Sequence, residues 1–110
     1  MSATPAALVE EALEHLGRVR AHLALVSYHP DLALDAVCLR LAAALDCVGR
    51  LPPDLRDAAC DGAWPVVRGM RNRIVHGYST VDPVMVLRTL ERRLEPLERG
   101  LDDVARVLRQ

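Results

Sequence analysis

The residues with the clearest potential for chemistry lie in one short stretch that ends at Tyr78. Asn72 directly follows Arg71, and His76 comes five residues after Arg71. An arginine can neutralise a phosphate, and a histidine can carry protons to and from the attacking and leaving oxygens. Residues of these types at this spacing are therefore suited to phosphodiester chemistry.

This stretch also carries a local excess of positive charge. Over the whole chain 14 arginines and 15 acidic residues give a net charge of −1, which excludes a polybasic nucleic-acid binder. Between Asp61 and Asp82, however, there is no acidic residue, and the basic residues there are Arg68, Arg71, Arg73 and His76. Contacts with an anion are thus expected in this segment.

The elements that position these residues are predicted to be helices in one domain, residues 1–110. Hydrophobic residues make up 51% of the chain, but it has no Phe, one Trp and two Tyr, while helix formers such as Ala, Leu, Arg and Glu dominate. A chain of 110 residues holds one core. The expected fold class is all-α, an up-and-down bundle of four or five helices.

Local signals mark the ends of the expected helices. Thr4 and Asp82 each precede a proline and are typical helix caps. Asp31 is a candidate cap for the second helix. Pro96 should bend or split the last helix. The second helix is apolar on nearly every side, as in a central or interface helix. The expected ranges are about 5–26, 32–50, 54–59, 64–77 and 83–108.

Helical spacing places Arg68, Asn72 and His76 on one face, because they are four residues apart. Arg71 and His76 do not share a ridge. They can converge if the helix ends near His76 and the Arg71 side chain bends towards that end, or if a symmetric dimer supplies the second Arg–His set.

Neither the cysteines nor the histidines outside the motif predict a metal site. Cys38, Cys47 and Cys60 lie among apolar residues without Cys-x-x-Cys spacing, which favours reduced core thiols. Three further histidines follow one another at seven-residue intervals: His15, His22 and His29. On a helix, successive members would lie about two turns apart, about 10.8 Å, which is too far to share one ion. We expect these side chains to be exposed to solvent.

No apolar run approaches the length of a membrane span, and no secretory leader is recognisable, so a cytoplasmic location is expected.

The string Arg71-Asn72-Arg73-Ile74-Val75-His76-Gly77-Tyr78 resembles the signature of HEPN-domain ribonucleases, in which Arg precedes His by four to six residues. The His-x-Tyr ending is similar to the HepT toxin branch, and the likeness extends over most of the chain. One departure lies in the second helix, where relatives often carry Gly-Glu-Ala and this chain has Leu45-Asp46-Cys47.

The resemblance implies a homodimeric, metal-independent endoribonuclease toxin that needs no cofactor and cleaves RNA such as tRNA or mRNA. Its partner would be a minimal nucleotidyltransferase antitoxin that silences the toxin by attaching AMP to Tyr78. Arg71 and His76 would be catalytic, with Asn72 orienting them. Arg68 and Arg73 would bind RNA, and Asp46 would be either a site acid or a hydrogen-bonded interface residue.

Two other functions fit the same residues. The basic segment could serve a non-catalytic module that binds a nucleotide or RNA, or the substrate-binding subunit of a nucleotidyltransferase. The chain could also be a purely structural helical dimer.

Overall fold

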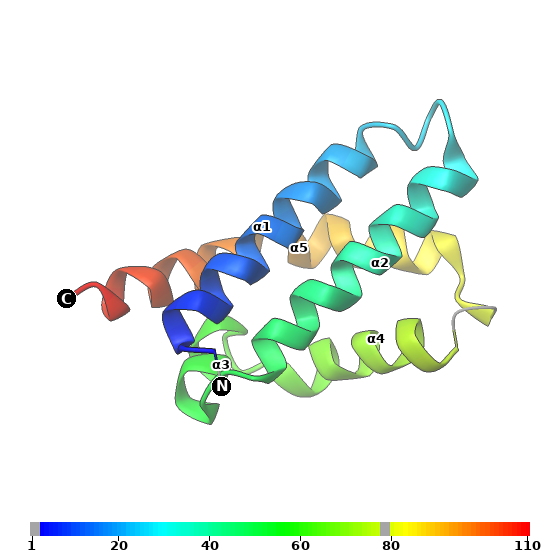
Figure 1. Ribbon diagram of the computed structural model, residues 1–110. Coiled ribbons are helices and arrows are strands. Elements are labelled where there is room, and N and C mark those ends of the chain that lie inside the picture. Colours follow the sequence, from blue (N-terminus) through cyan, green and yellow to red (C-terminus); the bar gives the residue numbers. More distant parts are fainter. Residues whose placement is uncertain (1–2, 78–79) are drawn as a thin grey trace.

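The computed structural model describes residues 3–77 and 80–110, and within them it contains five helices and no strand. The all-α class and the five-helix arrangement are therefore confirmed (Figure 1). The helices are α1 (Pro5–Leu23), α2 (Pro30–Gly49), α3 (Pro53–Ala59), α4 (Trp64–His76) and α5 (Pro83–Leu108).

Two of the predicted helix caps are present. The Thr4 hydroxyl accepts a hydrogen bond from the Ala7 amide at 3.1 Å, and the Asp82 carboxylate accepts one from the Val84 amide at 3.0 Å. The prediction that Asp31 caps the second helix is wrong: α2 begins at Pro30, two residues before the expected start, and Asp31 lies in its first turn. Proline at the first helical position fixes this earlier start, and the Asp31 charge faces the positive end of the helix dipole.

The breaks between helices also follow the sequence. Asp61 and Gly62 have φ angles of 49° and 76°, and this left-handed backbone separates α3 from α4. Pro96 does not split α5, which runs without interruption from Pro83 to Leu108. Pro96 is exposed, so water can reach the carbonyl that loses its hydrogen bond.

The helices pack around one core. α1 and α2 lie side by side, α4 runs along α2, and α5 passes behind α1 to reach α3 (Figure 1). The apolar seam of α5 is buried within the same chain, so the repeat serves intramolecular packing: Val86, Leu90, Leu94, Leu97, Leu101 and Val104. No helix of the described ranges is long and apolar enough to cross a membrane.

The second helix is central, and it also carries apolar side chains on its outer surface. Val37, Ala44 and Val48 are fully buried against the neighbouring helices. Leu32 and Leu39, seven residues apart and therefore on one stripe, are 72% and 71% exposed. Both roles considered for this helix, central and interfacial, are thus compatible with its surroundings.

Candidate active site

The rotation of α4 about its axis decides where the motif residues point. Val67, Met70 and Ile74 are buried and hold one side of the helix against the core. Arg68 and His76 are exposed on the opposite side, and Asn72, which lies between them on the same ridge, is partly exposed. The three residues therefore present one polar face to solvent.

Arg71 lies at the edge of this face that borders α2. Its Nη2 group donates a hydrogen bond to a carboxylate oxygen of Asp46 at 3.2 Å, and its Nη1 group donates to the Asn72 side-chain oxygen at 3.2 Å. The Arg71 and Asp46 side chains are 31% and 55% exposed. Asp46 is thus the partner of the motif arginine, and with respect to residues 3–77 and 80–110 the remaining guanidinium N–H groups are available to an anion.

His76 is the last residue of α4. Gly77 follows it, and the Gly77 amide donates to the Arg73 carbonyl at 2.9 Å, which closes the helix end. Five residues of helix separate His76 from Arg71 by about 140° around the axis and about 7.5 Å along it. Their side chains consequently leave α4 in different directions. Tyr78, the predicted modification target, lies outside the described residues.

Arg73 lies on the other border of α4, at a cleft of about 650 Å³ between α4 and α5. The cleft exists because α4 packs mainly on α2, whereas α5 packs mainly on α1 and α3. Its floor is apolar and includes Leu45, Met70 and Leu94. The basic residues that line it are Arg73, Arg88, Arg92 and Arg93.

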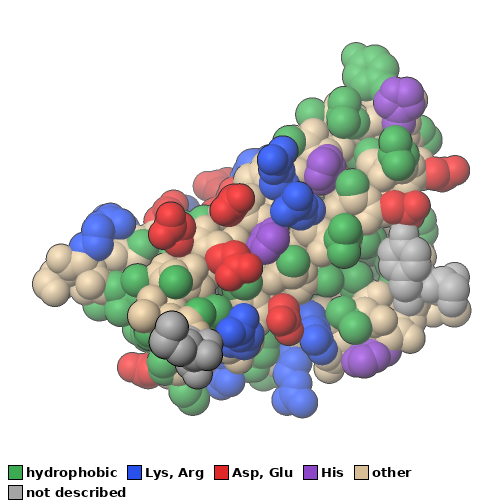
Figure 2. Space-filling model, viewed as in Figure 1, with side chains coloured by type: hydrophobic (Ala, Val, Ile, Leu, Met, Phe, Trp, Pro, Cys, Tyr) green, Lys and Arg blue, Asp and Glu red, His purple; other side chains and the backbone are tan. Residues whose placement is uncertain are grey.

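The sequence pattern did not indicate the α5 arginines as possible anion contacts. In the sequence they alternate with glutamates and are typical of a solvated helix face. Only the position of α4 brings three of them to the same cleft as Arg73. Elsewhere the charges remain mixed: on the face in Figure 2, acidic and basic side chains lie beside one another.

A second group of polar residues lies between α1 and α2. Glu11, His15 and Cys47 each place one potential ligand atom within 4.8 Å of the others. The expectation that His15 is exposed is wrong: its side chain is only 18% exposed, with Nε2 at 3.7 Å from a Glu11 oxygen. The four-residue spacing of Glu11 and His15 was the available signal, but their proximity to Cys47 depends on packing.

The three cysteines are free and buried, as predicted. Burial, followed by the negative charge of Glu11 and a hydrogen bond to it, raises the pKa of the Cys47 thiol to about 11. Burial is also the main cause that raises the pKa of the Cys60 thiol to about 11. Both side chains are therefore neutral thiols at neutral pH.

Comparison with known proteins identifies the family. No curated protein and no solved structure matches the chain. The model of one protein family, described as ribonuclease HepT-like, matches residues 9–104, which include all of α2 and α4 and most of α5. The chain therefore belongs to the HepT-like ribonuclease family.

Proposed function

We propose that this protein is the cytoplasmic toxin of a toxin–antitoxin pair and that it cleaves RNA without a metal ion. The observation that carries the proposal is the Arg71 guanidinium, held by Asp46 and Asn72 beside the exposed face that ends at His76. This arrangement occurs in a chain that belongs to a ribonuclease family.

The cleavage proceeds by attack of a ribose 2′-oxygen on the neighbouring phosphorus. The 2′-O–P bond forms while the P–O5′ bond breaks, leaving a 2′,3′-cyclic phosphate and a free 5′-hydroxyl. One histidine accepts the 2′-hydroxyl proton and another protonates the departing 5′-oxygen. The Arg71 guanidinium neutralises the phosphate as negative charge develops on its oxygens.

Two histidines at one phosphate call for two copies of the chain. Leu32, Leu39 and Asp46 follow one another at seven-residue intervals on α2, so the exposed apolar stripe leads to the partner of Arg71. Pairing of these stripes would bring two α4 motifs towards one RNA strand. Because a single chain has only one Arg71–His76 set, a symmetric homodimer would supply the second.

Arg68 and Arg73 guide the RNA to this site. Arg68 is exposed on the motif face, and Arg73 lies with the α5 arginines at the cleft. Their charges attract the phosphate backbone without reading its sequence.

Modification of Tyr78 controls the ribonuclease activity. A minimal nucleotidyltransferase antitoxin transfers AMP from ATP to the Tyr78 hydroxyl and releases pyrophosphate. Because Tyr78 follows His76 by two residues, the added phosphate and adenosine would occupy the space required by the RNA phosphate and repel it.

The test is cleavage of total RNA and purified tRNA in EDTA by wild type, His76→Ala, Tyr78→Phe and His29→Ala. His29 is a matched control because it is also exposed but lies in the turn between α1 and α2. Wild type, Tyr78→Phe and His29→Ala should cleave, while His76→Ala should lose about 10²- to 10⁴-fold in rate, the usual contribution of an acid–base group.

Equal cleavage by His76→Ala and wild type would refute the catalytic assignment. If wild type cleaves no RNA at any pH but binds nucleotide or RNA in the cleft between α4 and α5, the chain is a binding module. Co-expression with the antitoxin tests the control point: mass spectrometry should find one added AMP on wild type and none on Tyr78→Phe.

A further inference from the structure

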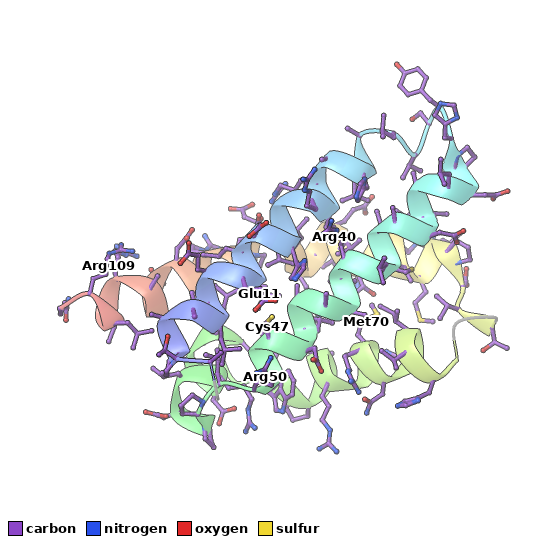
Figure 3. All side chains as sticks on the ribbon, viewed as in Figure 1. Glu11, Arg40, Cys47, Arg50, Met70 and Arg109 are labelled. Atoms are coloured by element: carbon purple, nitrogen blue, oxygen red, sulfur yellow. The ribbon has the colours of Figure 1, made fainter. Side chains whose placement is uncertain are left out.

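The group Glu11, His15 and Cys47 lies apart from the proposed ribonuclease site, in the contact between α1 and α2. Glu11 and His15 are one helical turn apart on α1, and Cys47 approaches them from α2. Figure 3 shows the Glu11 and Cys47 side chains extending into the space between the two helices. The potential ligand atoms of all three residues lie within 4.8 Å of one another.

We propose that these three residues form a binding site for Zn²⁺ that joins α1 to α2. Carboxylate oxygen, imidazole nitrogen and thiolate sulfur are the atom types that bind Zn²⁺ in proteins, and zinc sites with an open position combine three protein ligands with one water. The Glu11 side chain is 53% exposed, so solvent can reach the fourth position.

The three donor atoms need only small movements to surround one ion. Zn²⁺ binds oxygen and nitrogen at about 2.0–2.2 Å and sulfur at about 2.3 Å. His15 Nε2 already lies 3.7 Å from a Glu11 oxygen, a separation that two ligands of one tetrahedral ion can have. The Glu11 side chain is long and exposed, and it can close the remaining distance by a rotamer change.

Binding replaces one proton by the cation. The Zn–S bond forms as the Cys47 S–H bond breaks, and the released proton passes to solvent. His15 coordinates through Nε2 and therefore carries its ring proton on Nδ1. The carboxylate and the thiolate together offset the charge of the ion, so the coordinated group is electrically neutral.

The contact between Arg40 and His15 opposes zinc binding. The Arg40 Nη1 group lies 3.2 Å from His15 Nδ1, and Nδ1 can accept a hydrogen bond from this guanidinium N–H only if Nδ1 itself carries no proton. Coordination through Nε2 puts a proton on Nδ1, so Arg40 must turn away as the ion enters. Removal of the guanidinium should consequently strengthen metal binding.

The site would stabilise the helix that carries the Arg71 partner. Cys47 directly follows Asp46 on α2, so an ion shared with α1 restrains the backbone next to the Asp46–Arg71 ion pair. We assign the ion a structural role only, since its ligands lie on α1 and α2 and Arg71, Asn72 and His76 lie on α4.

The first experiment titrates the purified metal-free protein with Co²⁺, a spectroscopic substitute for Zn²⁺, and records the thiolate-to-cobalt charge-transfer band in the near ultraviolet. Wild type should show the band, and Zn²⁺ should remove it by competition. Cys47→Ala should lose the band. Cys38→Ala is the matched control, since Cys38 is a buried cysteine of the same helix, and it should keep the band.

Two further variants avoid any disturbance of the core. Glu11→Gln changes one exposed side chain and should weaken Co²⁺ binding by about tenfold or more, while Arg40→Met should tighten it. The same concentration of Zn²⁺ should raise the melting temperature of wild type more than that of Glu11→Gln. Absence of a charge-transfer band in wild type, or its persistence in Cys47→Ala, would overturn the proposal.

Discussion

Gly100 permits the close packing of α5 against α3, and its replacement by alanine is the sharpest test of this fold. A Cβ atom at position 100 would lie 2.0 Å from the Ala59 carbonyl oxygen and 2.9 Å from the Ala59 carbonyl carbon. Both are backbone atoms, so no side-chain rotation can relieve the overlap. Either α3 must move or α5 must tilt.

The size of the effect follows from these distances. Non-bonded heavy atoms settle at about 3.5 Å, so the helices must separate locally by about 1 Å or more. Overpacking of this kind costs about 1–3 kcal/mol, occasionally more. Alanine recovers up to about 1 kcal/mol through its higher helix propensity. Because the overlapping atoms belong to the backbone, the cost should lie at the upper end of this range, about 3 kcal/mol, and the net loss in the free energy of unfolding should be about 2 kcal/mol.

Gly69→Ala provides the control, because Gly69 is also helical and a Cβ there would meet no atom within 4 Å. This variant should be neutral or more stable by up to about 1 kcal/mol. Urea unfolding of both variants, followed by circular dichroism, measures the two free energies. If Gly100→Ala proved as stable as Gly69→Ala, the inferred contact between α3 and α5 would be incorrect.

Two further predictions concern charged and titratable groups. Asp46→Asn removes the ion pair with Arg71, yet it should change the free energy of unfolding by less than about 1 kcal/mol, because both side chains are solvent-accessible; a larger loss in urea unfolding would contradict this. The pKa of the Cys60 thiol is about 11, raised from 9.0, so about 100-fold less thiolate should exist at pH 8 than for an unshifted thiol. Alkylation of Cys60 by iodoacetamide, followed by peptide mass spectrometry, should accelerate with pH towards a midpoint near 11, and a midpoint near 9 would disprove the shift.

The amino-acid sequence by itself determined the helices and the motif. Thr4 and Asp82 cap helices through hydrogen bonds that reach only three and two residues along the chain. The break at Asp61 and Gly62 is equally local. The motif from Arg71 to Tyr78 is continuous in sequence, so it was recognisable before any fold was known.

Only the tertiary structure decided which residues meet across helices. Asp46 reaches Arg71 over 25 positions of the chain, and a Glu11–His15 turn meets Cys47 only because α1 packs on α2. Such contacts depend on the rotation and spacing of whole helices, which the burial of many apolar side chains determines together. A local sequence pattern indicates the buried face of one helix but not which helix packs against it. The sequence therefore indicated the motif but not the residues of other helices that surround it.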